Sequence, residues 1–253
     1  MSDAVRQAAE LAARARTITV FTGAGISAES GIPTYRGEGG LWQQYDPEKY
    51  ADIGYFRKDP TYYWSFFRDV RYEALVRSAP NAGHLAIAGL EAAGRGGSVI
   101  TQNIDGLHQQ AGSTKVNELH GNTRIIGCLG CGATYDFDEV KAKVVTQLPP
   151  LCDACGGLLK PRVVFFGEAL PRGAMETAAE AASTCDLLLV VGSTLQVFPA
   201  ASIPLVARRG GASVVIVNVG PTAMDELADV VVDGKAGEVL PGILDQSPTA
   251  PNS

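Results

Sequence analysis

The sequence lacks any apolar run long enough to cross a membrane. A membrane-spanning helix needs about 18 to 20 consecutive apolar residues, and no stretch approaches that length although 46% of the 253 residues are hydrophobic. Residues 1–7 also lack the basic start and the apolar core of a secretory signal. We therefore expect a cytoplasmic protein that makes no contact with a membrane.

Basic clusters are missing as well. The chain carries 21 Lys and Arg against 27 Asp and Glu, which gives a net charge of −6 at pH 7. Because a protein that binds a phosphate backbone needs a basic face, we expect no direct binding to nucleic acid. An acidic surface suits basic, lysine-bearing peptides, although it does not identify them.

Cysteine is scarce, but four of the five cysteines form two Cys-x2-Cys pairs, Cys128 with Cys131 and Cys152 with Cys155. The 20 residues between the pairs are typical of a zinc ribbon, in which four thiolates close a tetrahedral, structural site. Such pairs suit a reducing compartment better than disulfides do, and an iron–sulfur cluster is the alternative. Cys185 is left over and is expected to be an inert core thiol.

Short apolar segments with strand composition alternate with helical segments along most of the chain. The segments predicted as strands are residues 17–22, 98–102, 160–166, 186–191, 213–219 and 230–232. The segments predicted as helices are residues 3–16, 80–93, 172–183 and 199–209. This alternation predicts an α/β protein with a doubly wound, parallel, Rossmann-like sheet.

Two stretches interrupt that alternation and predict a smaller domain. Residues 37–78 are rich in aromatic and charged side chains and are expected to form short helices. Residues 122–162 hold the four paired cysteines and predict a zinc-ribbon insertion. The Rossmann-like domain is then built from residues 1–36, 79–121 and 163–245, and residues 246–253 are expected to be a disordered tail.

A glycine-rich turn follows the first predicted strand. Gly23, Gly25 and Ala28 fit the G-x-G-x-x-G/A pattern, which lets backbone N–H groups approach a pyrophosphate. A tight turn without a ligand has the same composition. A dehydrogenase of this fold also needs an acidic residue at the end of its second strand, and no predicted strand precedes an acidic residue at that distance. Hydride transfer is therefore disfavoured.

Polar turns follow four of the predicted strands. They comprise residues 23–27, 102–105, 192–194 and 218–220, and all four contain small or polar side chains. In a doubly wound sheet, ligands bind outside the carboxyl ends of the strands. We therefore expect these turns to converge on one dinucleotide site.

Three motifs give the chain a family resemblance. The run Gly-Ala-Gly-Ile-Ser-Ala-Glu-Ser-Gly-Ile-Pro at residues 23–33, the run Thr-Gln-Asn-Ile-Asp at residues 101–105, and the pair His120-Gly121 resemble the sirtuins, the NAD-dependent protein lysine deacylases. The resemblance extends from about residue 18 to about residue 240. It implies NAD as co-substrate, a structural zinc ion, and acyl-lysine proteins or peptides as substrates. We expect a monomer.

The resemblance also implies roles for individual residues. His120 matches the catalytic histidine, which takes a proton from a ribose hydroxyl, and Asn103 would orient the ribose and a water. Tyr35 stands where the family often has Phe, and Ser193-Thr194 where it commonly has Thr-Ser. The implied NAD contacts are Gly23, Ala24, Gly25, Ser27, Glu29, Tyr35, Arg36, Gln102, Asn103, Ile104, Asp105, Gly192, Ser193, Thr194, Asn218, Val219, Gly220 and Ala236. The implied contacts to the acyl peptide are Val163, Phe166, Gly167, Glu168, Leu195 and Val197.

In the mechanism that the resemblance implies, the carbonyl oxygen of acyl-lysine attacks the ribose carbon as nicotinamide leaves. The acyl group passes to the ribose, and hydrolysis releases free lysine and O-acyl-ADP-ribose. Two alternatives stay open: a protein ADP-ribosyltransferase built on the same site, and a non-catalytic NAD-binding sensor. Product analysis separates the three, since they yield deacylated peptide, labelled protein or intact NAD.

The preferred acyl group is predicted from an absence. Family members that remove succinyl or malonyl groups carry a Tyr-x-x-Arg pair before the Pro-Asn-x-x-His motif, because a buried carboxylate needs a cation and a hydroxyl. No tyrosine here has an arginine three positions later, and the matching positions are Phe67 and Val70. Arg71 is near, but on a helix it is expected to lean elsewhere. We therefore expect acetyl-lysine peptides to exceed succinyl-lysine peptides by at least about tenfold in kcat/KM.

Overall fold

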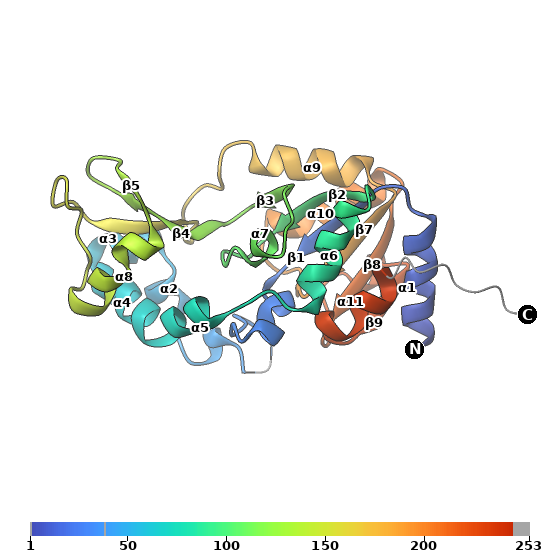
Figure 1. Cartoon of the computed structure of the whole chain (residues 1–253), viewed down its shortest axis with the longest axis horizontal. Coiled ribbons are helices and arrows are strands. Elements are labelled where there is room, and N and C mark those ends of the chain that lie inside the picture. The colour runs from blue at the N-terminus through green and yellow to red at the C-terminus, as the bar shows by residue number, and fades with distance from the viewer. Residues whose placement is uncertain (1, 38, 245–253) are drawn as a thin grey trace, which may run out of the picture.

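Six strands form one parallel sheet, which is the core of the larger of two lobes (Figure 1). The structure is a computed structural model that describes residues 2–37 and 39–244, so the predicted tail lies outside the described residues. The strands are β1 (Ile18–Thr22), β2 (Gly96–Thr101), β3 (Val116–Glu118), β7 (Leu187–Val191), β8 (Ser213–Asn218) and β9 (Val230–Asp233).

The order of the strands is β3-β2-β1-β7-β8-β9, and every neighbouring pair is parallel. The chain winds outward in one direction from β1 and in the other from β7, which confirms the predicted doubly wound α/β fold. All residues of β1 and β7 are buried, as expected for strands covered on both faces. The order reverses between these two strands, and ligands bind such sheets at the carboxyl side of this switch point.

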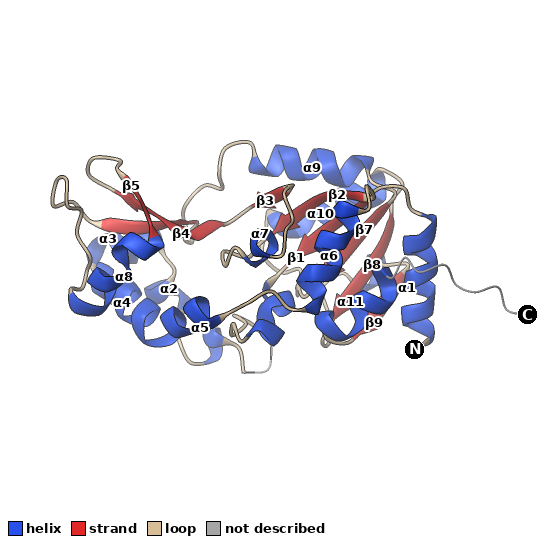
Figure 2. Cartoon of the chain, viewed as in Figure 1, coloured by secondary structure: helices blue, strands red, loops and turns tan. Residues whose placement is uncertain are grey.

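Helices cover both faces of the sheet (Figure 2). One face packs against α1 (Asp3–Arg14), α6 (Ala82–Ala92) and α11 (Ala236–Leu244), and the other against α9 (Ala174–Thr184) and α10 (Ile203–Arg209). Successive side chains of β7 alternate between the two cores, so that Leu189 packs with the first group and Leu188 with the second. The described elements of this lobe also include α7 (Leu107–Gln110) and the 3₁₀ turns η1 (Ala24–Ser30), η4 (Ala200–Ser202) and η5 (Asp225–Leu227).

The smaller lobe contains an antiparallel sheet, in the order β5-β4-β6, and a group of short helices (Figure 1). Its strands are β4 (Gly121–Cys128), β5 (Thr134–Asp136) and β6 (Leu159–Val163). Its helical segments are η2 (Leu41–Gln43), α2 (Pro47–Tyr50), α3 (Ile53–Lys58), α4 (Pro60–Phe66), the π-helical η3 (Phe67–Arg71), α5 (Tyr72–Arg77) and α8 (Phe137–Thr146). Trp64 from α4 and Ile126 from β4 are fully buried in one shared core, so two insertions that are distant in the sequence fold together.

Several elements were not predicted from the sequence, among them β3, α8 and α11. Strand β3 has only three residues. Helix α8 lies within the cysteine-rich stretch, and a capping box between Asp136 and Glu139 begins it. Helix α11 contains Pro241, a poor helix former, and is stabilised by packing on α6 and α1. The strand predicted at residues 160–166 ends at Val163 and pairs with β4 in the small sheet.

Within the described residues, no helix is both long and apolar enough to cross a membrane.

Candidate active site

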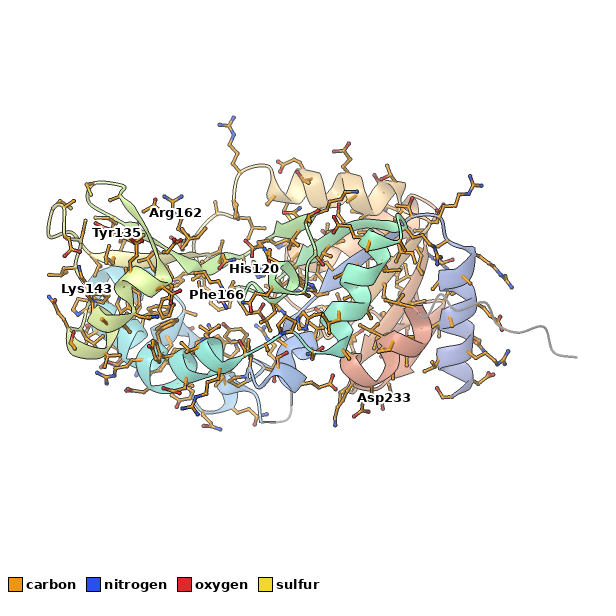
Figure 3. The ribbon with its side chains drawn as sticks, in the orientation of Figure 1. His120, Tyr135, Lys143, Arg162, Phe166 and Asp233 are labelled. Carbon is orange, nitrogen blue, oxygen red and sulfur yellow. The ribbon has the colours of Figure 1, made fainter. Side chains whose placement is uncertain are left out.

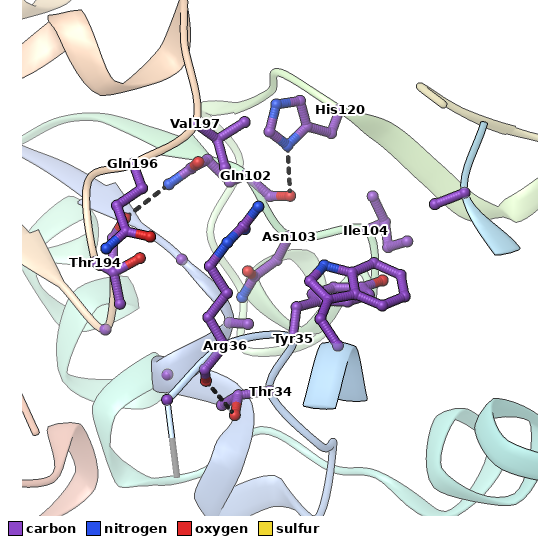
Figure 4. Close-up of a pocket in the computed structure, with 18 of the residues that line it drawn as sticks. Thr34, Tyr35, Arg36, Gln102, Asn103, Ile104, His120, Thr194, Gln196 and Val197 are labelled. Carbon is purple, nitrogen blue, oxygen red and sulfur yellow. Dashed lines mark hydrogen bonds between the residues drawn. The ribbon is translucent and has the colours of Figure 1, made fainter. Parts of the chain in front are cut away.

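A cavity of about 960 Å³ lies between the two lobes, at the carboxyl ends of β1 and β7 (Figure 4). Every residue predicted to contact NAD or the peptide lines this cavity except four: Ser27, Asp105, Leu195 and Gly220. Residues that the sequence analysis did not select line it too, among them Tyr63, Arg71, Val164, Phe165 and Lys235. Of these, only Val164 and Phe165 could have been identified from the sequence, because they lie between the predicted contacts Val163 and Phe166.

Three glycines let the turns after β1 and β7 approach each other closely. Gly25 N donates to Gly192 O at 2.8 Å. A Cβ atom on Gly25 would lie 2.7 Å from Gly192 Cα, and one on Gly23 would lie 2.7 Å from Gly192 O, both too close for any side chain. At these positions the two turns therefore contact each other through backbone alone, which keeps them close together at the cavity, where a pyrophosphate would bind.

Ser27 and Asp105 lie behind the lining and hold Asn103 in place. Ser27 is fully buried; its Oγ donates to Asp105 Oδ2 at 2.8 Å and accepts from Asn103 Nδ2 at 3.1 Å. Asp105 Oδ1 accepts from Leu107 N at 2.9 Å, which fixes the turn. Asn103 N also donates to Thr101 Oγ1 at 3.0 Å. Because both its backbone and its amide are bound, Asn103 presents its remaining amide oxygen in one orientation.

His120 directly precedes β4, and its ring lies beside Gln102 (Figure 4). The Nδ1 atom is 3.1 Å from Gln102 O. A carbonyl oxygen only accepts, so Nδ1 carries the proton and Nε2 is left as an acceptor. Burial lowers the pKa of His120, and the bond to Gln102 opposes that effect. The ring is therefore neutral near pH 7 and its Nε2 is able to take a proton.

The placement of Arg71 differs from the sequence expectation. Arg71 is 7% exposed, lines the cavity, donates to Tyr35 Oη, and lies 5.2 Å from the centroid of the Tyr35 ring. It ends the π-helical turn η3, which adds one residue to the helical turn and changes the direction of the side chains that follow. The expectation that Arg71 leans elsewhere was therefore wrong. Tyr63 Oη is buried nearby and has no partner among the described residues.

The residues predicted to contact the acyl peptide fall into two segments, residues 163–168 and 195–197, here called the two peptide edges. The first packs on the core of the small lobe through Val163 and Phe165, and the second on the core of the large lobe through Leu195. Phe166 and Phe198 form exposed parts of the cavity rim, at 45% and 66% exposure. Leu195 has a positive φ of 55° and its side chain is buried in the sheet core, so it does not point into the cavity. Val197 lines the cavity as predicted.

The four paired cysteines meet in the small lobe. Their Sγ atoms all lie within 4.8 Å of one another, with 3.5 Å between Cys128 and Cys155 and 3.7 Å between Cys131 and Cys152. Backbone N–H groups and the Tyr135 hydroxyl, 3.0 Å from Cys152 Sγ, point at these sulfurs, as thiolate ligands require. Four converging thiolates fit a tetrahedral zinc ion. None of the four lines the cavity, so the site is structural.

Two buried histidines lie beneath the site. The ring centroids of His84 and His108 are 5.0 Å apart, and His108 Nε2 is 2.9 Å from Thr22 Oγ1. His84 closes the cap of α6, since its Nδ1 accepts from Asn81 N at 3.4 Å. Burial lowers the pKa of His84 to about 4 and that of His108 to about 3. Both rings are neutral in the folded protein at neutral pH.

We expect these histidines to make the protein acid-sensitive. An unfolded histidine takes up a proton near pH 6.5, whereas both folded rings resist protonation down to about pH 4. The free energy of unfolding should then fall as pH drops below about 6.5, by up to about 1.4 kcal/mol per pH unit for each ring. Denaturant unfolding at pH 7.5, 6.0 and 5.0 measures the slope. In His108→Gln one titrating ring is lost, so the slope should be smaller by up to about 1.4 kcal/mol per pH unit. An unchanged slope would contradict the conclusion that His108 is neutral in the folded protein.

Comparisons with known proteins agree with this geometry. The Sir2 family model matches residues 23–199. NAD-dependent protein deacylase 2 of Pyrobaculum aerophilum is 51% identical over 238 residues, covering 94% of each chain. A structure from work on the mechanism and regulation of Sir2 enzymes has a TM-score of 0.90 at 49% identity and covers 96% of this chain and 97% of its own.

A second structure shows what a relative holds. It is a Sir2 variant with a deacetylated p53 peptide and 3′-O-acetyl ADP-ribose, and it has a TM-score of 0.91 at 37% identity, covering 97% of this chain and 99% of its own. The family model spans the turns at Gly23 and Gly192, His120 and the four cysteines, and the relative and both structures match more than nine-tenths of the chain. The chain therefore belongs to the Sir2 family.

Proposed function

We propose that this chain, an NAD-dependent protein deacylase, transfers the acyl group of acyl-lysine to ADP-ribose with release of nicotinamide. The observation that supports this most directly is the joint placement of His120 and Asn103 in one cavity with the glycine turns. Residues of both lobes line that cavity. We also propose the division of the chain into a Rossmann-like domain and a two-part insertion domain, with NAD on the carboxyl side of the large sheet and the peptide in the cleft beside it.

The residues present fit NAD. The N–H groups of Gly23, Gly25 and Gly192 are bonded to protein carbonyls, so N–H groups of the neighbouring turn residues would hold the pyrophosphate. Gln102 Nε2 donates to Ser193 Oγ at 2.9 Å and joins the turn after β2 to the turn after β7. Arg36 extends from its loop toward Gln102 and Asn103 (Figure 4) and would add a positive charge to the part of the cavity that holds NAD. When bound, NAD supplies an activated ribose carbon and a leaving group.

His120 acts as the general base in this proposal. Its Nε2 accepts a proton from a ribose hydroxyl, because Nδ1 is already bound to Gln102 O. Asn103 orients the ribose and a water through an amide that Ser27 fixes from behind. Ser27 and Asp105 thus act through Asn103.

The acyl peptide is proposed to bind between the two edges as an added strand. Main-chain hydrogen bonds supply the affinity in this mode, and within the described part of the chain neither Val164 O nor Gly167 N has a partner. Phe166 and Phe198 at the rim would flank the backbone of the substrate. Because such binding reads the backbone more than the side chains, we propose acyl-lysine peptides of varied sequence as substrates, bound by a monomer without nucleic acid.

Arg71 makes acyl selectivity testable. The expected preference for acetyl-lysine rested on an apolar channel end, yet a buried guanidinium whose bonded partner is the uncharged Tyr35 hydroxyl lines the cavity. If the distal part of an acyl chain reaches it, Arg71→Met should raise the acetyl-to-succinyl ratio of kcat/KM by at least about tenfold, because a charge-assisted bond contributes about 1.5–3 kcal/mol. Matched peptides that differ only in the acyl group measure the ratio. An unchanged ratio would show that Arg71 does not contact the acyl group.

Product analysis tests the proposed function itself. An acetyl-lysine peptide incubated with NAD should yield deacetylated peptide, nicotinamide and O-acetyl-ADP-ribose in equal amounts by mass spectrometry. ADP-ribose attached to protein would instead indicate a transferase. Intact NAD with unchanged peptide would indicate a sensor, and either result would overturn the proposal.

A further inference from the structure

Lys160 is a buried lysine at the base of one peptide edge, on strand β6. The residue is 6% exposed, and its Nζ lies 2.8 Å from Glu168 Oε2. The same ammonium donates to Val163 O at 2.7 Å and to Pro161 O at 3.4 Å. Three oxygen acceptors thus surround a group with three N–H donors, which is what a buried ammonium needs.

Glu168 and Phe165 complete this cluster. Glu168 Oε2 also accepts from Phe165 N at 2.9 Å. The Phe165 ring lies over the ammonium, with its centroid 4.1 Å from Lys160 Nζ, close enough for a cation–π contact. The family resemblance implies that Glu168 contacts the peptide, whereas in the structure Glu168 Oε2 is bound to Lys160 and Phe165. We name Lys160, Glu168 and Phe165 the Lys160 cluster.

The segment that the Lys160 cluster holds forms one wall of the active site. All of residues 163–168 line the cavity. Val164 N donates to His120 O at 2.9 Å, and Phe166 N donates to Ala51 O at 2.8 Å, so both lobes contact this segment. The cluster binds Val163 O and Phe165 N, while Val164 O and Gly167 N have no partner in the described part of the chain.

We propose that Lys160 is a positioning residue for the acyl peptide, and that its ion pair with Glu168 holds residues 163–168 in the shape that accepts a substrate strand. A preformed edge lowers the ordering cost of binding. The inference rests on the peptide-binding role proposed for this edge. It separates peptide binding from proton transfer, because the bond that orients the His120 ring goes to Gln102 O, outside the cluster.

The first test is Lys160→Met, which keeps the length of the side chain and leaves Glu168 in place. The KM for an acetyl-lysine peptide should rise at least about tenfold, equivalent to about 1.4 kcal/mol. The KM for NAD and kcat should change by less than about threefold, since the lost interaction is not specific to the transition state. Fluorescence anisotropy with a labelled acetyl-lysine peptide gives the same comparison without turnover.

The double variant Lys160→Met with Glu168→Met separates positioning from stability. Removing one partner of a buried ion pair is costly, whereas replacing both by apolar groups is often neutral. Lys160→Met should therefore lower the melting temperature, and the double variant should recover most of it. The KM for peptide should stay high in the double variant, because Val163 O and Phe165 N have still lost their partners.

Lys143→Met is the matched control. Lys143 also pairs with a carboxylate and a carbonyl, Asp153 at 2.5 Å and Leu151 O at 3.1 Å. It lies at the outer end of the small lobe, away from Phe166 and His120 (Figure 3). The KM of the Lys143→Met variant for the peptide should match that of the wild type.

Two results would overturn the inference: a wild-type KM for peptide in Lys160→Met, or a KM in the double variant that recovers together with the melting temperature. If Lys160→Met does not fold, the double variant decides alone: a raised KM in the folded protein supports the inference and a normal one overturns it. A wild-type protein that binds the peptide but does not deacetylate it would contradict the proposed function and leave the binding comparison intact.

Discussion

His120→Ala is expected to lower kcat for NAD-dependent deacylation by roughly 10²–10⁴-fold, the usual contribution of a general base. The ring has one bonded nitrogen, Nδ1 to Gln102 O at 3.1 Å, so the variant removes the free Nε2 and little packing. The melting temperature and the affinity for NAD should stay close to those of the wild type. Near-normal turnover in a folded variant would contradict the role of His120.

The pH profile gives this assignment a second readout. Burial lowers the pKa of His120 below its ordinary value near 6.5. The base therefore stays deprotonated to a lower pH, and activity should persist below pH 6.5 before it falls on the acid side. This acid limb should be absent from the residual activity of His120→Ala, because no other group replaces the lost base.

The sequence predicts the convergence of the turns and of the four cysteines well, because their signals are local. Gly23 and Gly25 follow a buried strand, and the Cys-x2-Cys pairs carry their own spacing, so neither depends on distant contacts. Parallel strands bring their carboxyl ends to one edge of a sheet. The convergence of the turns after β1, β2, β7 and β8 could therefore be predicted without knowing any distance.

The remaining features depend on packing that no local pattern records. Arg71 lines the cavity because a single π turn changes the direction of its side chain, whereas a regular helix would turn it elsewhere. Leu195 points into the core because its backbone adopts a positive φ. Ser27 and Asp105 were assigned to NAD by resemblance, whereas the structure places them one layer behind Asn103. The position of each of these residues in the chain is known from the sequence, but the direction in which its side chain points is not.

Cys152→Ser is expected to abolish activity although no zinc ligand lines the cavity. Strand β4 starts one residue after His120, and β6 ends where the peptide edge starts, at Val163. The four cysteines join the outer ends of this sheet. The folding of a small metal site is coupled to metal binding, so losing one thiolate should loosen both strands and displace the catalytic histidine and the peptide edge together.

The measurements for Cys152→Ser are zinc content, melting temperature and turnover. The wild type should hold one zinc ion per chain by elemental analysis, and the variant should hold little, melt at a lower temperature and lack deacylation. Cys185→Ser is the matched control, because Cys185 is the fifth cysteine and lies in the core of the large lobe, where its Sγ donates to Ala182 O at 3.3 Å. That control should keep zinc and activity. Full activity in zinc-free, folded Cys152→Ser would show that the small sheet holds His120 without the metal, and iron in the wild type would favour a cluster instead.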